Sequence, residues 1–139
     1  MITSLYPVLM SEDVHQAAQF FIENFQFQET FRSDWYISLK NIESGFELAF
    51  IEGKHETVPQ AYQSMTSGLI INIEVEDVDF LYEELRQQEE MEFLLPIKSE
   101  DFGQRHFIVE ARGSVLVDVI QVIPPSAEFM ENYLESEDE

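Results

Sequence analysis

The sequence predicts an α+β protein built from two tandem β-α-β-β-β modules. Three observations lead to this expectation. A short apolar strand followed by an amphipathic helix occurs twice, three further strand candidates follow each helix, and the two copies keep one register. Asp13 and Asp77 lie 64 residues apart, and so do Leu9 and Ile73. The chain is therefore expected to repeat one unit rather than to alternate unrelated elements.

The first module is expected to open with a strand at Leu5–Met10. A helix follows, because apolar residues recur at three- and four-residue intervals at Val14, Ala17, Ala18, Phe21 and Phe25. Asp13 can act as its N-cap, with Gln16 three positions on in a capping-box arrangement. The remaining strand candidates of this module are Phe27–Phe31, Trp35–Leu39 and Phe46–Ile51.

The second module repeats this order. Its strand at Leu69–Val75 precedes a helix with the apolar spacing Val78, Leu81, Tyr82 and Leu85. Its later strand candidates are Glu92–Ile97, Arg105–Val109 and Val115–Val122. Turn-forming residues separate the strands of both modules at Ser33-Asp34, Ser44-Gly45, Ser99–Gly103 and Arg112-Gly113.

These elements predict a single domain over residues 1–123, with module 1 at about 4–52, a linker at 53–67 and module 2 at about 68–123. Proline residues close the last strand at 124–125. In the C-terminal segment, 124–139, Ser126 is expected to cap a short helix with Phe129, Met130, Tyr133 and Leu134 on one side. We expect the acidic residues 135–139 to form a solvated, frayed tail.

Composition limits the function classes. Of 139 residues, 28 are acidic and 7 are basic, giving a formal charge of −21, and 45% are hydrophobic. The apolar content predicts a folded core, while the charge disfavours binding to nucleic acid or anionic membranes. With no cysteine the chain has no disulfide, thiolate nucleophile or Cys-ligated metal centre. A secretory leader pattern is missing at the N-terminus, so we expect a cytoplasmic protein.

Two segments of this repeated architecture resemble a known family. They are Tyr6–Val14, which reads Tyr-Pro-Val-Leu-Met-Ser-Glu-Asp-Val, and Asp101–Val109, which reads Asp-Phe-Gly-Gln-Arg-His-Phe-Ile-Val. Together with the repeat they resemble the vicinal oxygen chelate superfamily of glyoxalases, bleomycin-resistance proteins and extradiol dioxygenases, over roughly residues 4–123. Residues 101–121 are most similar to bleomycin-resistance-type members. The resemblance implies the glyoxalase/bleomycin-resistance fold, in which an open cup-shaped mixed sheet is backed by the helices, and a homodimer.

The resemblance also implies where a metal would bind. Metal-dependent relatives place His, Glu, His and Glu on the first and last strands of the modules, and these positions match Tyr6, Glu47, Ile70 and Asp118. Ile70 has no donor atom, and a tyrosine ionises only near pH ~10. The two histidines and one carboxylate of the Fe(II) dioxygenases are also missing at these positions. We therefore expect no metal and no other cofactor.

Strand alternation indicates which side chains line the cup. If Glu47 and Asp118 face inward, so do Tyr6, Asn72 and Glu74. The opposite parity is expected to pack beneath the helices; it comprises Leu5, Leu9, Phe46, Leu48, Phe50, Ile71, Ile73, Val75, Val117 and Val119. The strong apolar bias of this second set favours the assignment.

Further candidates come from the penultimate strand and the strand ends. His106 turns toward the cup if Phe107 is core, whereas His15 and His55 are expected outside the site. Aromatic residues near strand ends, Phe31 among them, lie where bleomycin-resistance relatives stack planar ligand rings. The predicted ligand-binding residues are Tyr6, Trp35, Tyr36, Glu47, Asn72, Glu74, Phe102, His106 and Asp118.

These features favour a non-catalytic protein that binds a small aromatic or cationic molecule, resembling drug-sequestering bleomycin-resistance proteins. The alternative is a glyoxalase-related lyase or isomerase, or a dioxygenase-like enzyme, with a non-standard metal or a metal-free acid–base site at Glu47, Asp118 and His106. The two carboxylates could otherwise hold a hard cation such as Mg²⁺, or pair with neighbours such as Arg105. A third class, an immunity or scaffold protein acting through its acidic surface and tail, is a weaker alternative.

Overall fold

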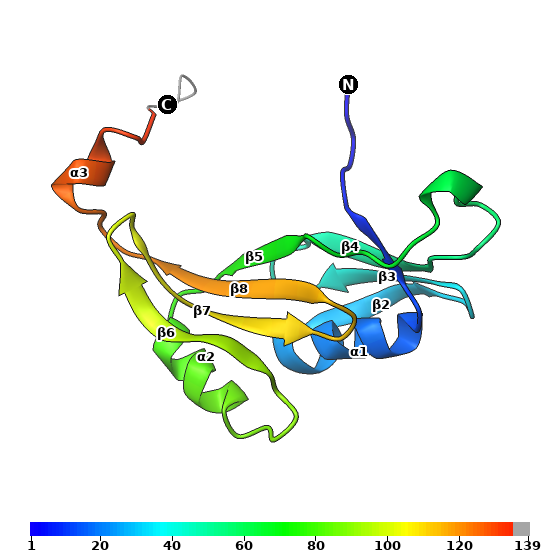
Figure 1. Cartoon of the computed structure of the whole chain (residues 1–139), viewed down its shortest axis with the longest axis horizontal. Coiled ribbons are helices and arrows are strands. Elements are labelled where there is room, and N and C mark those ends of the chain that lie inside the picture. Colours follow the sequence, from blue (N-terminus) through cyan, green and yellow to red (C-terminus); the bar gives the residue numbers. More distant parts are fainter. Residues whose placement is uncertain (135–139) are drawn as a thin grey trace. The chain divides into compact units, whose positions relative to one another are not determined.

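A computed structural model, which describes residues 1–134, shows the two expected β-α-β-β-β modules (Figure 1). The strands of the first form a four-stranded sheet in the order β1-β4-β3-β2, with β1 parallel to β4 and the other pairs antiparallel. The elements are β1 Val8–Ser11, α1 Val14–Phe25, β2 Phe27–Arg32, β3 Tyr36–Asn41 and β4 Glu47–Glu52. An α+β fold with open sheets is thereby confirmed.

The second module repeats this topology in the order β5-β8-β7-β6, with β5 parallel to β8 and β6 antiparallel to β7. Its elements are β5 Ile70–Glu74, α2 Val78–Leu85, β6 Phe93–Glu100, β7 Gln104–Ala111 and β8 Val115–Val122. A 3₁₀ turn, η1 at Gln60–Tyr62, lies in the linker, and α3 at Ala127–Met130 follows the last strand. None of the helices within residues 1–134 is long and apolar enough to cross a membrane.

The chain divides into two compact units that follow the modules closely. The first contains Met1–Leu69 together with the β7–β8 turn, Ala111–Val115. The second contains Ile70–Glu110 and the chain from Leu116 onward.

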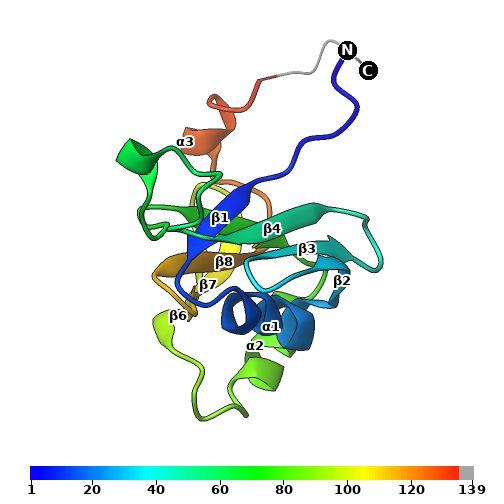
Figure 2. The same cartoon turned by 90° about the vertical axis from the view of Figure 1, so that its right-hand side faces the viewer.

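In the first unit α1 lies along one face of the sheet (Figure 2). The Asp13 carboxylate caps it as expected, accepting hydrogen bonds from the backbone N–H groups of His15 and Gln16. Phe21 projects from α1 into an aromatic cluster, with ring centroids 5.8 Å from Phe27 and 5.7 Å from Phe50. These contacts fix which face of β2 and β4 is core.

In the second unit, contacts among three aromatic rings likewise define the core face of the sheet. Tyr82 of α2 lies 5.3 Å from Phe93 and 5.0 Å from Phe107, measured between ring centroids. Phe107 therefore faces α2, as do Val117 and Val119 on the neighbouring strand, which are fully buried. By alternation, His106 and Asp118 project from the opposite face.

The residues expected to pack beneath the helices do so within the strands, but the expectation is wrong for two residues that precede a strand. Leu9, Leu48 and Phe50 are buried, whereas Leu5 and Phe46 are 82% and 75% exposed. Both lie before the first residue of a strand, where the sheet no longer covers their side chains. The expected first strand at Leu5–Met10 is correspondingly shifted to Val8–Ser11.

Three local expectations at the C-terminal side are wrong. Ser99 and Glu100 belong to β6 rather than to the following turn. The Ser126 hydroxyl makes no capping bond; its backbone carbonyl accepts from Phe129 and Met130 instead. Tyr133 and Leu134 lie beyond the end of α3, so they share no helix face with it. The predicted acidic tail, 135–139, lies outside the described residues.

The segment after β8 instead packs over the turn between β6 and β7. The Ile123 N–H donates to the Gly103 carbonyl at 3.0 Å, the Ser126 N–H donates to the Asp101 carbonyl at 2.8 Å, and the Tyr133 hydroxyl donates to the Phe102 carbonyl at 2.5 Å. Gly103 has a φ of +109°, and a Cβ there would lie 2.9 Å from the Tyr133 hydroxyl. This position is thus closed to side chains by both its backbone and its neighbours.

We predict that Gly103→Ala lowers the free energy of unfolding by about 2–4 kcal/mol, through a left-handed backbone and an overpacked contact. Gly113→Ala is the matched control, because φ there is +95° but no atom lies within 4 Å of the added Cβ. Backbone strain alone should cost it about 1–2 kcal/mol. Urea denaturation of both variants measures the difference, and equal losses would contradict the described packing around Gly103.

Candidate functional site

Polar side chains form a row across the face of the second sheet that is turned away from α2. Asn72 on β5 is paired with Asp118 on β8, and His106 on β7 is paired with Lys98 on β6. The two middle residues of the row are joined by a hydrogen bond of 2.7 Å from His106 Nδ1 to Asp118 Oδ1. Four strands thus contribute one polar side chain each to the same line.

His106 sits between two carboxylates. Its Nε2 lies 2.9 Å from Glu100 Oε2, on the side opposite the Asp118 contact. His106 and Asp118 are only 5% and 8% exposed. A neutral imidazole has one donor nitrogen, so both contacts are satisfied only by the doubly protonated ring. The geometry therefore describes an imidazolium held between β6 and β8.

The electrostatics follow from this geometry. Burial by itself lowers the pKa of His106, but the hydrogen bonds to Glu100 and Asp118 outweigh it and leave the pKa raised. The hydrogen bond from His106 lowers the pKa of the Glu100 carboxyl, with help from Lys98, whose Nζ lies 3.4 Å from the same oxygen. Two cations and two carboxylates balance, which makes burial of the cluster tolerable.

This pairing limits what His106 can do. Each ring nitrogen donates to a carboxylate, so neither carries a lone pair for accepting a proton or for ligating a metal ion. The group can act as a proton donor or as a fixed positive charge. Asp118 is correspondingly occupied on one oxygen, while Arg105, expected as a possible partner for the site carboxylates, pairs with Asp79 at 2.8 Å and contacts Ser99.

The residues at the metal positions that the resemblance implies do not fit a metal site. Ile70 is half exposed and has no donor, and Tyr6 offers only a phenol. Asp118 already accepts from His106, and Glu47 accepts a 3.3 Å hydrogen bond from the Ser4 hydroxyl. Among residues 1–134, no three His, Asp or Glu side chains are grouped so as to hold an ion.

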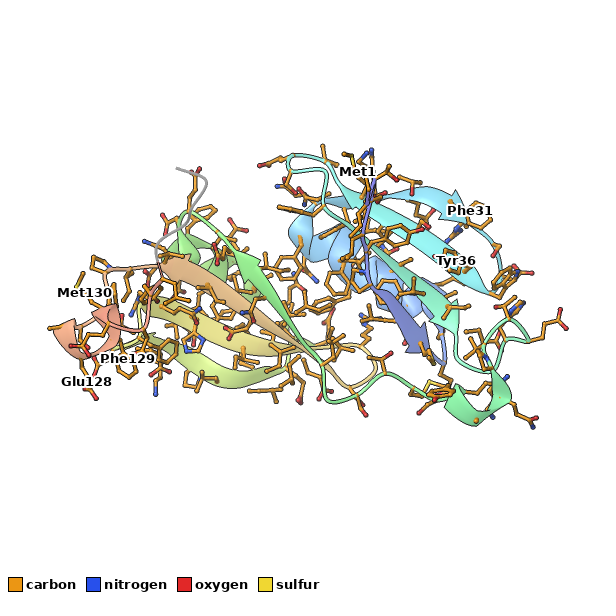
Figure 3. All side chains as sticks on the ribbon, turned by 90° about the horizontal axis from the view of Figure 1, so that it is seen from above. Met1, Phe31, Tyr36, Glu128, Phe129 and Met130 are labelled. Carbon is orange, nitrogen blue, oxygen red and sulfur yellow. The ribbon has the colours of Figure 1, made fainter. Side chains whose placement is uncertain are left out.

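The corresponding row of the first sheet is apolar and aromatic apart from one serine. Val8, Ala49, Ser38 and Phe31 form a row across its four strands. Phe31 is 54% exposed, and its ring packs edge-on against Tyr36 of β3 at 6.1 Å (Figure 3). This face offers a flat, partly exposed surface for a ligand.

Two tyrosines and a tryptophan extend this aromatic surface. Burial raises the pKa of Tyr36, and the neighbouring phenol of Tyr6 raises it further, so Tyr36 stays a neutral hydroxyl. Tyr6 is itself 44% exposed. Trp35, just before β3, lies edge-on to Tyr36 at 5.7 Å and is stacked on His55 of the linker. Three of the predicted binding residues are therefore in one group.

The other predicted residues are distributed as follows. Phe102 lies in the β6–β7 turn, edge-on to His106 at 6.2 Å, so it joins His106 and Asp118 in one cluster. Asn72 and Glu74 are exposed on β5. Glu47 begins β4 at the end of the first sheet, beside Ser4.

Glu100 and Lys98 were missed by the sequence analysis. The strand before them was expected to end at Ile97, which placed Glu100 in a turn, whereas β6 continues to Glu100. In the β6–β7 register Lys98 is opposite His106 and Glu100 is opposite Gln104, two residues further on. Only this register shows that Lys98 and Glu100 lie on the same face as His106.

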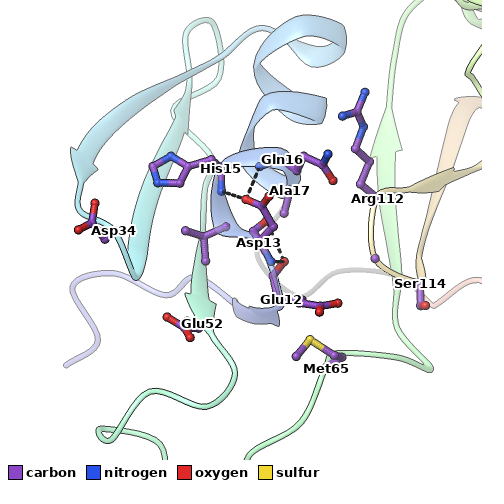
Figure 4. Close-up of a pocket in the computed structure, with 13 residues that line it drawn as sticks. Glu12, Asp13, His15, Gln16, Ala17, Asp34, Glu52, Met65, Arg112 and Ser114 are labelled. Carbon is purple, nitrogen blue, oxygen red and sulfur yellow. Dashed lines mark hydrogen bonds between the residues drawn. The ribbon is translucent and has the colours of Figure 1, made fainter.

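A separate open hollow of about 640 Å³ lies in the first unit at the start of α1 (Figure 4). Carboxylates of Glu12, Asp13, Asp34 and Glu52 line it, together with Arg112. The Asp13 carboxylate is engaged in the helix cap. None of the predicted binding residues lines this hollow.

We predict that the protein loses stability as the pH rises above about 6.5, the ordinary pKa of a histidine. The folded-state pKa of His106 lies above its ordinary value of 6.5, so its contribution is complete below about 6.5 and is lost as the pH rises through the folded-state value. His106→Gln should cost about 2–4 kcal/mol at pH 6, because it leaves the buried Asp118 carboxylate without its cation, and should flatten this part of the pH profile.

Urea denaturation between about pH 5.5 and 9 measures this profile. His15→Gln, which changes a less buried histidine near Arg32, serves as the control and should keep the slope. The lowered pKa of Glu100 gives the opposite pH dependence. The stabilisation by the Glu100 carboxylate is complete above pH 4.5, the ordinary pKa of the group, and is lost as the pH falls through the lowered pKa. An identical slope in wild type and His106→Gln would refute the assigned charge of His106.

The comparisons with known proteins agree with this architecture. No curated protein matches the chain. Among solved structures it is similar to a glyoxalase/bleomycin resistance protein/dioxygenase family enzyme from Burkholderia phytofirmans PsJN, with 18% identity, coverage of 85% of this chain and 97% of that one, and a TM-score of 0.71.

Two further structures share the fold. A member of the same superfamily from Sphaerobacter thermophilus DSM 20745 has 15% identity, coverage of 87% and 98%, and a TM-score of 0.70. A glyoxalase-related enzyme from Fulvimarina pelagi has 17% identity, coverage of 86% and 88%, and a TM-score of 0.66. Residues 4–119 match the family model of the Glyoxalase/Bleomycin resistance protein/Dioxygenase superfamily, and the chain therefore belongs to that superfamily.

Proposed function

We propose that the protein binds a small aromatic or cationic molecule on the helix-free faces of its sheets, without making or breaking a bond. The observation that carries this proposal is an asymmetry. The ionisable groups of the second sheet that could perform chemistry, His106 and Asp118, are already paired with each other, whereas the aromatic surface of Tyr6, Phe31 and Tyr36 is partly exposed.

The aromatic surface suits a planar ligand. Tyr6 and Phe31 keep about half of their side-chain surface open to solvent although they belong to a folded face. Covering such rings with a flat ligand removes apolar area from water, and stacking adds about 0.5–1.5 kcal/mol per ring pair. Phenol hydroxyls on Tyr6 and Tyr36 supply polar contacts that set the orientation of the ligand.

The charges favour a ligand that is neutral or positive. The net charge of −21 attracts cations and repels anions. Glu47 is paired with a neutral hydroxyl, and Glu74 is exposed on β5, so both carboxylates are open to a cationic group. The paired His106 cluster then stabilises the second sheet rather than taking part in a reaction.

The exposed tyrosines allow a matched test. Native mass spectrometry of protein from its own cells should reveal a retained small molecule, and Tyr36→Ala should release it or weaken its binding about tenfold, because an aromatic anchor is lost. Tyr62→Ala is the control, since Tyr62 is a largely exposed linker tyrosine. Equal effects of the two substitutions, or a stoichiometric transition metal in the spectrum, would contradict the proposal.

A catalytic function is the second candidate, and one observation favours it. His106 is a buried cation oriented by Asp118, an arrangement that suits a general acid. Members of the superfamily from Burkholderia phytofirmans and Fulvimarina pelagi are described as enzymes. The proton would leave Nδ1 or Nε2 only after one carboxylate contact had been broken.

If the protein is an enzyme, Glu47→Gln and Asp118→Asn should each abolish turnover while the fold persists, as checked by circular dichroism. Assays with 2-oxoaldehydes, epoxides and catechols cover the chemistry of the superfamily. Turnover by wild type that both variants lose would overturn the binding proposal, whereas no turnover of any of these substrates supports it.

A further inference from the structure

The chain beyond β8 folds back onto the β6–β7 turn. Residues 124–134, which include α3, are named the C-terminal strap here (Figure 1). The carbonyl oxygens of three successive turn residues, 101–103, each accept one hydrogen bond from this part of the chain. The donors are the Ser126 N–H and the Tyr133 hydroxyl of the strap, and the N–H of Ile123 just before it. The strap therefore docks on the turn itself.

The strap is held to the turn by few polar contacts. Pro124 and Pro125 have no N–H, so no backbone donor fixes the chain between Ile123 and Ser126. No ion pair joins the strap to any other part of residues 1–134. The buried Ser126 hydroxyl has no hydrogen-bond partner. A buried hydroxyl without a partner is destabilising, and opening of the strap would restore its hydration.

The strap also buries little apolar surface. Met130, Tyr133 and Leu134 are 62%, 59% and 93% exposed. Phe129 makes the one ring contact of the strap within residues 1–134, edge-on to Phe102 with ring centroids 6.3 Å apart. Segments with so few buried contacts open locally at a much smaller free-energy cost than unfolding of the whole domain.

Phe102 connects the strap to the His106 cluster. Its ring lies edge-on to Phe129 on the strap and edge-on to His106 at 6.2 Å. Its carbonyl accepts the hydrogen bond from the Tyr133 hydroxyl. Both the ring and the backbone of Phe102 are therefore held by the strap, while His106 is only 5% exposed on a face that no helix covers.

We infer that the C-terminal strap is a lid that opens while the rest of the second unit stays folded, and that its closure keeps water away from the His106 imidazolium. The Tyr133 hydroxyl is its catch. Opening releases Phe102 and lets water reach the contact between His106 Nε2 and Glu100, so the strap controls exchange of that proton. This inference goes beyond the proposed function and is independent of the aromatic surface of the first unit.

Hydrogen exchange measured by NMR at about pH 6, where the raised pKa keeps His106 doubly protonated, tests the lid. The ring N–H groups of His106 report access of water to the cluster, and the backbone N–H of residue 126 reports opening of the strap. The N–H of the fully buried Val117 reports global unfolding. If the lid opens by itself, the first two rates follow the open fraction of the strap and the third does not.

Tyr133→Phe removes the catch and keeps the ring. We expect the His106 ring N–H groups and the N–H of residue 126 to exchange about fivefold faster, which corresponds to the loss of one hydrogen bond, with Val117 unchanged. Tyr62→Phe, at an exposed tyrosine of the linker, is the matched control and should leave all three rates at their wild-type values.

Ser126→Ala should act in the opposite direction. It removes the hydroxyl that has no partner, and no capping bond is lost with it. We expect the same two rates to fall about fivefold, because the closed state is relieved of a buried polar group.

Three outcomes would overturn the inference. One is wild-type exchange of the His106 ring N–H groups in folded Tyr133→Phe. Another is faster exchange of the same groups in Ser126→Ala. The third is an equal acceleration of Val117 in Tyr133→Phe, which would mean that the cluster is exposed by global unfolding and not by a lid.

Discussion

In each module a single helix covers one face of a four-stranded sheet, and this one-sided burial decides the direction of every strand side chain. The contact is aromatic in both cases, through Phe21 against Phe50 in the first unit and Tyr82 against Phe107 in the second. Once these rings are placed, a period of two sends the alternate side chains to the other face. A shift of one residue in β8 would bury the Asp118 carboxylate under a helix, which the cost of burying charge forbids.

The two sheet faces that no helix covers differ in their side chains. In the second sheet, His106 and Asp118 are buried although no helix covers them, and burial is made tolerable by completing the pairing with Glu100 and Lys98. In the first sheet the face is aromatic, and exposure of Phe31 leaves a surface without a partner within the unit. A closed ion cluster on one sheet and an open aromatic face on the other together favour recognition over reaction.

Fold and chemistry are separable in this superfamily member. The repeat and topology agree with structures of 15–18% identity. Ile70 is on β5 and 53% exposed, so its side chain contributes little to the core of the second unit. A fold of this kind therefore does not by itself determine which chemistry its exposed positions perform.

The sequence by itself determined the repeat, the two helices, the Asp13 cap of the first, and the parity that directs His106 and Asp118 away from the helices. These features are local, and periodicity together with side-chain chemistry is sufficient to predict them. Only the tertiary structure decided that Glu100 pairs with His106, that Arg105 pairs with Asp79, and that His55 lies on Trp35. Each of these partners depends on a strand register, a strand end or a turn, and those are set by packing between segments far apart in the chain.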